Sequence, residues 1–246
     1  MITLLTLFFG FIPINIIKIF LLNSLGHKIS YKSKIGFSVL FIKRIELDKN
    51  TKINSFNFIK INKLVLKDGS FIGRFNIING PFEMFLDSKA GISKQNKIRR
   101  SNAPISYGNA VLSLGYNSFI VSNHFLDLTR SIEIGENSII AGIGSQLWTH
   151  GYYHSDKGSK RIRIDGEIII RNNVYVGSSC IFNPGVVVNK AIHIGAGSTV
   201  SKNLVESGMY VSQSLRYIDN DLEKVKSKLD RMEDFQSIEE VYMKNV

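Results

Sequence analysis

Large apolar residues recur every six positions along much of this chain. Near the amino terminus they are Ile35, Phe41, Leu47, Ile53, Ile59, Val65, Phe71 and Ile77, and nearer the other end they are Ile170, Val176, Phe182, Val188, Ile194 and Val200. A period of six matches neither the 3.6-residue period of an α-helix nor the two-residue alternation of a strand. It is typical of a chain wound into a β-solenoid, in which each short strand contributes one large aliphatic side chain to the interior.

The repeat divides the chain into three parts. We expect residues 1–30 to form an apolar helical segment, residues 31–211 to form one solenoid domain, and residues 212–246 to form a helical tail. The first repeat tract is predicted to run in unbroken register. The pattern then fails between residues 146 and 167, a polar, basic and aromatic stretch. We interpret this stretch as a loop excursion, and loops that leave a rigid scaffold often carry function.

The tail has the periodicity of a helix. Its apolar residues are spaced by three or four positions, with charged residues between them: Leu222, Val225, Leu229, Met232 and Phe235. This spacing predicts an amphipathic helix from about residue 220 to residue 239, which we expect to pack on the solenoid or on a neighbouring subunit.

The first 22 residues are strongly apolar. They carry neither the basic start nor the small-residue cleavage site of a secretory signal. Pro13, Asn15 and Lys18 interrupt the run, whereas a membrane-spanning helix needs about 20 apolar residues. Three interpretations remain open: short helices lying on the cytoplasmic face of a membrane, an apolar cap on the end of the solenoid, or a surface buried between subunits.

The formal net charge is +11, and residues 1–100 hold 17 Lys or Arg against 5 Asp or Glu. A basic body suggests an anionic partner, such as a membrane surface, a phosphorylated cofactor or an acidic glycan, although lysines at solenoid corners are often simply solvated. No nucleic-acid-binding motif is recognisable, so no nucleic-acid partner is expected. The single cysteine, Cys180, excludes an intrachain disulfide and suggests a reducing, cytoplasmic location. Its position predicts a packed structural thiol.

An ordered set of short motifs between residues 134 and 218 adds a resemblance. The motifs are Ile134-Gly135-Glu136-Asn137, Trp148-Thr149-His150-Gly151, Asn172-Asn173-Val174-Tyr175-Val176-Gly177, Asn183-Pro184-Gly185-Val186-Val187-Val188, and Ile194-Gly195-Ala196-Gly197-Ser198-Thr199-Val200-Ser201-Lys202. In this order and spacing the chain resembles the hexapeptide-repeat acyltransferases. It is similar to galactoside and maltose O-acetyltransferases and to O-acetyltransferases of bacterial surface-polysaccharide loci. The resemblance implies an all-β fold, a left-handed parallel β-helix of hexapeptide repeats.

The resemblance also implies a catalytic residue and a donor site. His150 matches the family's catalytic histidine, a general base whose ordinary pKa suits proton transfer near neutrality. Acetyl-CoA would be the acyl donor, and no metal is expected. The positions that match coenzyme A contacts are Ser178, Ala196, Ser201, Lys202 and Arg216, and Tyr175 stands where the family usually has tryptophan. A backbone N–H near Ser178 would stabilise the oxyanion.

Two further residues are candidates for binding the acceptor. Asn123 aligns with an acceptor-binding asparagine, Asp127 follows closely, and either would orient the acceptor or His150. Three other histidines are interpreted as structural or solvent-exposed: His124, His154 and His193. A γ-class carbonic anhydrase shares the solenoid, but its histidine pair has a five-residue step, whereas His150 and His154 are four apart.

The sequence therefore predicts an acetyl-CoA-dependent O-acetyltransferase that modifies a sugar hydroxyl in the synthesis of a bacterial capsule, O-antigen or exopolysaccharide. The resemblance implies a homotrimer. We expect a cytoplasmic protein, with peripheral contact to the inner membrane face through residues 1–22 as an open option. Two alternatives remain: an N-acetyltransferase acting on an amino group of a nucleotide sugar, and a non-catalytic structural solenoid.

Overall fold

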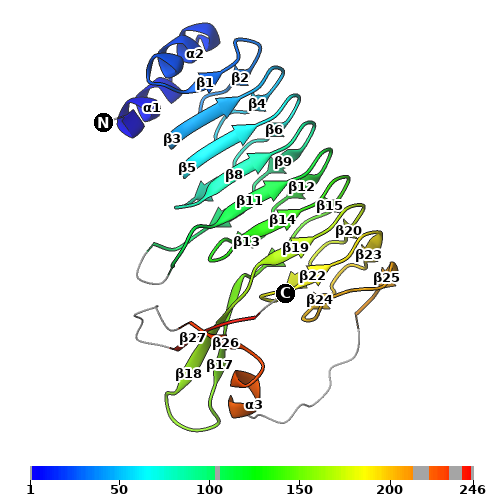
Figure 1. The fold of residues 1–246 in the computed structure, drawn as a ribbon. Coiled ribbons are helices and arrows are strands. Elements are labelled where there is room, and N and C mark those ends of the chain that lie inside the picture. Colours follow the sequence, from blue (N-terminus) through cyan, green and yellow to red (C-terminus); the bar gives the residue numbers. More distant parts are fainter. Residues whose placement is uncertain (1, 103–105, 213–221, 233–239, 245–246) are drawn as a thin grey trace.

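Parallel strands stacked coil upon coil form a long column, capped at one end by two helices and carrying a projecting hairpin near the other (Figure 1). The structure, a computed structural model, describes residues 2–102, 106–212, 222–232 and 240–244. The column is a left-handed parallel β-helix, and the predicted all-β fold is confirmed. Hydrogen bonds between coils pair each strand with strands of the preceding and following coils.

Three walls of strands enclose the apolar interior. The first wall is a nine-stranded sheet of β2 (Lys34–Ile35), β4 (Lys52–Ile53), β6 (Phe71–Ile72), β9 (Gly91–Lys94), β12 (Phe119–Ser122), β15 (Ile139–Ile140), β20 (Tyr175–Val176), β23 (Ile192–Ile194) and β25 (Gly208–Tyr210). The other two walls form one 14-stranded sheet, because the nine-residue strands β3 (Val39–Leu47) and β5 (Phe58–Leu66) bridge them and β1 (Lys28–Ile29) pairs with β3.

The second wall precedes the corner that carries the site described below, and the third wall follows that corner. The second wall contains β7 (Ile77–Asn79), β10 (Lys97–Arg99), β13 (Phe125–Asp127), β16 (Gln146–Leu147), β21 (Ile181–Phe182) and β24 (Thr199–Val200). The third contains β8 (Glu83–Leu86), β11 (Val111–Leu114), β14 (Ile132–Ile134), β19 (Ile168–Ile170) and β22 (Val187–Val188).

The six-residue register holds in the second repeat tract and fails in the first. Every large apolar residue predicted to point inward between positions 170 and 200 is buried. In the first tract Phe41, Phe71 and Ile77 are only half-buried, so the expectation of unbroken register was wrong. For Phe71 and Ile77 the cause is coil length: three hexads per coil would pair Ile53 with Phe71, whereas Ile53 pairs with Ile72. Phe41 is out of phase earlier, because the buried apolar residue that follows Ile35 is Leu40, five positions on. A coil longer than three hexads shifts the inward phase of every residue that follows it.

A polar ladder runs inside one corner of the column. Asn76 accepts through Oδ1 from the backbone N–H of Asn96 at 2.9 Å, and Asn96 accepts in the same way from His124. His124 continues the ladder, because its Nδ1 accepts from the N–H of Ser145 at 3.1 Å. Burial lowers the pKa of His124 to about 4, so this imidazole is neutral near pH 7. His124 therefore has the structural role expected of it.

Two short helices, α1 (Ile2–Gly10) and α2 (Asn15–Ser24), close the first coil. Asn15 continues the sheet hydrogen bonding, because its Oδ1 accepts from the N–H of Ile35 at 2.9 Å. The buried Lys18 donates from Nζ to the carbonyls of Ile35 and Gly36 at 2.8 and 2.9 Å, and burial lowers its pKa to about 8. The segment is thus a cap on the solenoid. No helix of the described chain is long and apolar enough to cross a membrane.

A small mixed sheet, with antiparallel and parallel strand pairs, projects from the column between β16 and β19 (Figure 1). It consists of the hairpin β17 (His150–His154) and β18 (Arg161–Asp165), with β27 (Glu240–Met243) and β26 (Asp230–Arg231) from the tail. The expectation of one helix over residues 220–239 was wrong in the described part. Helix α3 spans only Leu222–Lys226, and β27 forms because it pairs in parallel with β18.

Candidate active site

The hairpin places His150 at a corner of the column, beside the end of β13. His150 is the first residue of β17, and it follows directly on the buried Thr149, where the chain leaves the coil. Asp127 is the last residue of β13, in the preceding coil. Strand pairing between β13 and β16 therefore brings the two side chains to the same corner.

A dense hydrogen-bond network joins these residues. His150 Nδ1 lies 2.8 Å from Asp127 Oδ2, and the side chains are 24% and 8% exposed. Thr149 donates to the same oxygen, from its backbone N–H at 3.1 Å and from its hydroxyl at 2.8 Å. The hydroxyl of Thr129 donates to Asp127 Oδ1 at 2.9 Å. Every hydrogen bond in this network holds the carboxylate in one orientation.

The network sets the tautomer and the acidity of the imidazole. Because the carboxylate accepts at Nδ1, that nitrogen carries a proton and Nε2 keeps the free lone pair of the neutral ring. The hydrogen bond with Asp127 raises the pKa of His150 above its usual value of 6.5, against burial, which lowers it. Burial would raise the pKa of Asp127, but hydrogen bonds with His150, Thr149 and Thr129 lower it overall.

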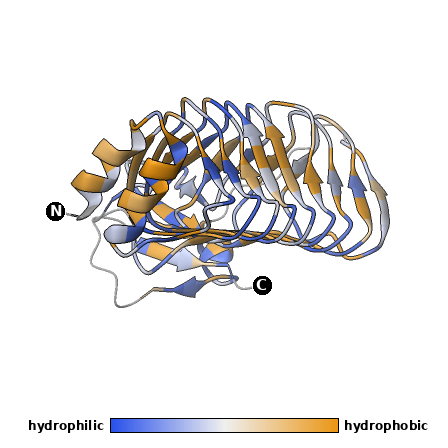
Figure 2. Ribbon diagram, turned by 90° about the horizontal axis from the view of Figure 1, so that it is seen from above, coloured by the Kyte–Doolittle hydropathy of each residue, from blue (hydrophilic) through white to orange (hydrophobic). Residues whose placement is uncertain are grey.

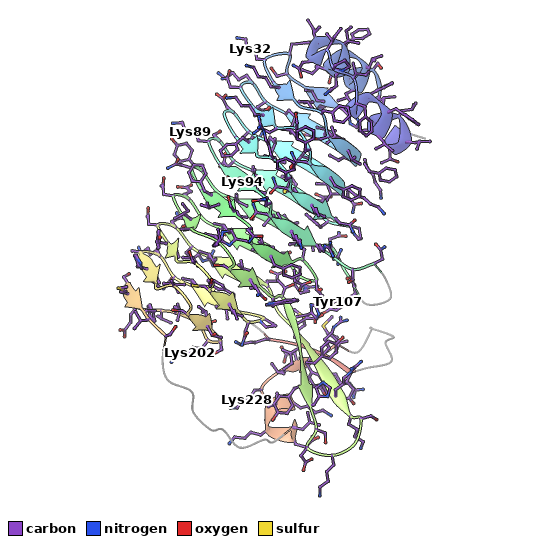
Figure 3. All side chains as sticks on the ribbon, turned by 180° about the vertical axis from the view of Figure 1, so that it is seen from behind. Lys32, Lys89, Lys94, Tyr107, Lys202 and Lys228 are labelled. Atoms are coloured by element: carbon purple, nitrogen blue, oxygen red, sulfur yellow. The ribbon has the colours of Figure 1, made fainter. Side chains whose placement is uncertain are left out.

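A second carboxylate influences the charge of the imidazole. Asp165 is opposite His150 in the register of the hairpin and is fully buried. It forms two hydrogen bonds of 2.9 Å with the guanidinium of Arg163, which is itself 2% exposed. The Asp165 charge adds to the rise in the His150 pKa, and Arg163 opposes it. Tyr107, which lies where the hairpin leaves the column (Figure 3), stacks its ring under the Arg163 guanidinium at 5.8 Å.

His150 lines a cavity of about 750 Å³ between the hairpin, the column and the tail. The walls are aromatic and basic, and among the described residues they are Trp148, His150, Gly151, Tyr152, Tyr153, Ile164, Asn183, Pro184, Lys224, Val225, Lys228, Leu229 and Lys244. The volume suits a small organic ligand. A neutral imidazole held by a buried carboxylate at the wall of such a cavity is equipped to accept a proton from a bound hydroxyl.

The residues expected to hold coenzyme A lie on two different edges of the column. Ser201 and Lys202 are exposed, and they follow β24 on the same edge as His150 (Figure 3 labels Lys202). Ser178 and Ala196 lie on the edge between the first and second walls, and Tyr175 is on the outer face of the first wall, 4.5 Å from the ring of His193. Arg216 lies outside the described residues.

The two candidate acceptor residues are separated by a strand. Asn123 is exposed at the corner before β13, with a φ of 56°, whereas Asp127 ends that strand. Four extended residues span about 13 Å, so a single copy of the chain does not bring Asn123 to His150. Of the two, Asp127 alone joins the histidine network.

The other expectations concern side chains without a proposed role. His154 is exposed in β17, and His193 points outward from β23. Cys180 is fully buried, and its thiol lies 3.2 Å from the carbonyl of Gly195. Within the described residues, no group of three or more His, Cys, Asp or Glu is arranged to hold a metal ion.

Sequence reasoning did not assign roles to Thr129, Thr149, Asp165 or the tail lysines of the cavity. The sequence showed Thr149 within the Trp148-Thr149-His150-Gly151 motif, but no neighbouring residue indicated that its hydroxyl would donate to Asp127. The tail residues reach the cavity only because β27 pairs with β18, which lies far earlier in the chain.

Known proteins provide an independent comparison. No family model matches the chain. Galactoside O-acetyltransferase of Escherichia coli (strain K12) is 32% identical over 105 residues, which cover 40% of this chain and 48% of that protein. Two relatives from Staphylococcus aureus are 32% identical over 117 residues, covering 45% of this chain and 57% of theirs. The chain thus spans about half the length of the relatives it matches.

Two solved structures also align with the column. The polySia specific acetyltransferase NeuO is 18% identical, with a TM-score of 0.46 over 76% of this chain and 82% of that chain. The polysialic acid O-acetyltransferase OatWY is 15% identical, with a TM-score of 0.36 over 82% of this chain and 92% of that chain. The resemblance to hexapeptide-repeat acyltransferases, given above on sequence motifs, agrees with the names of the relatives matched by sequence.

Proposed function

We propose that this protein is an acetyl-CoA-dependent O-acetyltransferase that acts on a sugar hydroxyl. The observation that carries the proposal is the hydrogen bond between Asp127 and His150 at the wall of the cavity. The sequence similarity to galactoside O-acetyltransferase supports the reaction class. A purely structural solenoid has no need of a buried carboxylate fixing a half-buried imidazole.

In the proposed mechanism His150 first accepts a proton and later donates it. Nε2 accepts the proton of the acceptor hydroxyl as its oxygen attacks the thioester carbonyl, which forms the new C–O bond and a tetrahedral oxyanion. When the intermediate collapses, the C–S bond breaks and the protonated imidazole returns the proton to the leaving thiolate. Asp127 stays ionised throughout and stabilises the imidazolium, as the hydrogen bonds with Thr129 and Thr149 favour.

The walls of the cavity favour a sugar as the acceptor. Trp148, Tyr152 and Tyr153 present aromatic surface on which the apolar face of a pyranose ring packs. The polar groups of Asn183 and His150 stand beside that surface, where they would orient hydroxyl groups. We therefore propose a saccharide acceptor, made or modified during synthesis of a bacterial surface polysaccharide.

The distribution of the expected donor residues supports a homotrimer with composite sites. Ala196 and His150 lie on different edges of the column, and about five extended residues, or roughly 16 Å, separate the two edges. If both residues serve one reaction, they come from neighbouring copies of the chain. The backbone N–H near Ser178, on the same edge as Ala196, would then stabilise the oxyanion from the adjacent subunit.

Labelled acetyl-CoA and a panel of candidate glycans test the proposal directly. We expect acetyl transfer to a saccharide hydroxyl, and we expect His150→Ala to lower kcat/KM about 10²- to 10⁴-fold. His154→Ala is the matched control, because His154 is exposed in the same strand and should leave the rate unchanged. Equal rates for His150→Ala and the parent protein would refute the mechanism, and transfer to amines alone would favour N-acetylation.

A further inference from the structure

The cavity beside His150 has a basic wall that the proposed chemistry does not use. Lys224 belongs to α3, Lys228 follows that helix, and Lys244 follows β27. All three line the same cavity as the imidazole. Figure 3 shows Lys228 beside the projecting hairpin, on the side where the tail packs. The tail thus closes the cavity with positive charge.

The charges of Lys228 and Lys244 are not balanced within the described part of the cavity. No Asp or Glu occurs among the described lining residues, and neither Lys228 nor Lys244 forms an ion pair with a described acidic residue. Burial lowers the pKa of Lys244, because its ammonium has lost part of its water. Lys226, by contrast, does not line the cavity and pairs with Glu240 at 2.8 Å. Within the described chain, the tail therefore neutralises Lys226 and leaves Lys228 and Lys244 available to a ligand.

The same cavity also has aromatic lining residues. Trp148 and Tyr152 flank His150, with ring centroids 6.2 and 6.1 Å from the imidazole. A ligand that satisfies both walls has a ring with an apolar face and a negatively charged substituent. Ammonium groups bind carboxylates and phosphates through charge-assisted hydrogen bonds, which are stronger than those between neutral groups.

We propose that the cavity binds an anionic sugar, whose carboxylate or phosphate contacts Lys228 and Lys244 while a ring hydroxyl faces His150. This inference rests on the proposed function, since it names the acceptor class of the same site. It predicts selectivity for charge: a neutral sugar of the same size would leave two ammonium groups of the cavity without an anion.

Binding can be measured without any reaction, because Trp148 is the protein's single tryptophan and lies in the cavity wall. The probes are a hexuronic acid trisaccharide and its carboxyl-reduced counterpart, together with glucose 1-phosphate and glucose. We expect tryptophan fluorescence to change with at least one charged probe, at a Kd about tenfold or more below that of its neutral partner. The more effective pair identifies the carboxylate or the phosphate. Equal affinity within both pairs, or no response to either charged probe, would overturn the proposal.

Lysine variants of the full chain assign the contact. Lys228→Gln and Lys244→Gln are each expected to weaken the charged probe about three- to tenfold and to leave the neutral probe unchanged. Lys228→Arg should retain binding, and Lys226→Gln is the matched control from the same segment. The charged probe binding equally to Lys228→Gln, Lys244→Gln and the parent would also overturn the proposal.

Two comparisons separate this inference from the proposed function. Desulfo-coenzyme A is titrated into the same variants: a loss of its binding, with the charged sugar unaffected, would assign the lysines to the donor and overturn the acceptor assignment. Charge-dependent sugar binding without any acetyl transfer would support the site and contradict the proposed reaction. Transfer to neutral sugars only would support the reaction and contradict the site.

A second, independent observation concerns the capping helices. While Ile19 and Leu22 are buried against the column, Phe8, Ile16 and Phe20 on the outer side are each more than 60% exposed. In Figure 2 both helices are largely coloured as hydrophobic. The surface continues down one edge of the column through Phe37, Phe56 and Phe75, which are 49%, 56% and 54% exposed. We call this surface the apolar cap: the outer faces of α1 and α2 with these three phenylalanines.

Two phenylalanines of the apolar cap occupy an unusual backbone conformation. Phe56 and Phe75 have φ angles of 68° and 60°, a region that favours glycine and asparagine. Their rings stack at 5.4 Å, and Phe11, in the turn between the two helices, contacts Phe37 at 4.9 Å. Exposed aromatic rings held at a conformational cost point to a role outside the fold.

Positive charge is concentrated in the coils beside the apolar cap. Residues 28–67 hold ten Lys or Arg and two Asp or Glu. Lys32, Lys34 and Lys52 line a cavity of about 660 Å³ on the first wall, whose following edge carries the phenylalanines, and Figure 3 shows Lys32 beside the helices. Apolar side chains with lysines beside them complement an anionic lipid surface, whereas a second copy would place like charges together.

We propose that the apolar cap lies on an anionic membrane surface, with the column projecting from it. Flotation with vesicles of phosphatidylcholine, with or without about 30% phosphatidylserine, tests this for the whole chain. We expect binding that requires the anionic lipid and falls about tenfold in Phe8→Ser/Phe20→Ser. Val205→Ser is the matched control, because Val205 is 66% exposed near the opposite end of the column. Equal flotation of all three proteins would overturn the proposal, as would self-association abolished by the double variant without any lipid binding.

Discussion

Asp127 and His150, from successive coils of the column, are joined by a hydrogen bond of 2.8 Å between Oδ2 and Nδ1. The bond crosses from one coil to the next, so the strand pairing of the column sets the distance between Asp127 and His150. Thr149, the neighbour of His150, donates twice to the same carboxylate oxygen. The histidine is therefore fixed both by its partner and by the residue that precedes it.

Replacing Asp127 with asparagine tests the positioning role of the carboxylate. The asparagine retains the shape of the side chain but removes its charge, so the imidazolium formed during the reaction loses its stabilising partner. We expect kcat to fall about 10²-fold, with a smaller change in KM. Steady-state kinetics measure this, and circular dichroism checks that the column remains folded. A variant with the kcat of the parent would contradict the role of Asp127.

The pH dependence follows from the raised pKa of His150. The general base must be neutral, so kcat/KM should rise with pH through an apparent pKa above 6.5. In Asp127→Asn the apparent pKa should move to lower pH, because Asp127 is the main cause of the rise. Rate profiles from pH 5 to pH 9 measure both midpoints, and a shift to higher pH would contradict the assignment.

The same ionisation has the opposite effect on stability. Because the folded pKa of His150 exceeds the unfolded value, its protonated form stabilises the fold most fully below pH 6.5. That contribution is lost as the pH rises through the folded pKa. Thermal unfolding of the parent and of His150→Gln across this range should therefore differ most at acidic pH. A difference that grows with rising pH would contradict the linkage.

The sequence predicted the column better than it predicted the register. Between residues 170 and 200 paired residues are three hexads apart, so that Val176 pairs with Ile194 and the inward phase follows directly from a six-residue period. In the first tract Ile35 still pairs with Ile53, three hexads on, but the coils that follow are longer, because Ile53 pairs with Ile72 and Ile72 with Ile92. There an inward Ile72 replaces the expected Phe71, because both residues are apolar and only the coil length distinguishes them.

The sequence predicted the site residues that lie in or next to the regular coils. It did not predict the residues that distant segments, such as the tail, bring to the site. A motif marked His150, and Asp127 was a candidate orienting residue, because Asp127 lies in a regular coil and His150 directly follows one. Residues 222–235 have helical spacing, yet their described part ends as a strand at Asp230–Arg231, and β27 adds to β18 farther on. Partners of this kind are chosen by tertiary pairing, which local propensity does not encode.

Subunit mixing tests the composite site. His150→Ala and Ala196→Glu each disable one half of a site that neighbouring copies would share. In mixed trimers about one quarter of the sites combine an intact His150 with an intact Ala196, so mixing should restore activity that neither variant shows alone. The measurement is the rate after co-refolding, compared with the two variants refolded separately. No recovery in a trimer that exchanges subunits would place both residues in one copy's site.

The interior asparagine ladder makes a prediction about stability. The fully buried Asn76 donates from Nδ2 to Asn57 Oδ1 and to the carbonyl of Ser93, at 3.1 and 2.8 Å, and it accepts from Asn96. Asn76→Ala leaves these buried groups without partners, so the free energy of unfolding should fall by about 2–4 kcal/mol. Denaturant titration measures the loss.

The control for the ladder is Asn189→Ala. Asn189 is exposed and makes one side-chain hydrogen bond, to the carbonyl of Val205 at 3.1 Å, so its loss should cost less than about 1 kcal/mol. The two variants remove the same chemical group and differ in burial and in the number of partners. Equal destabilisation would mean that the ladder contributes no more than a surface hydrogen bond, and the column would then owe its stability to the stacked aliphatic residues alone.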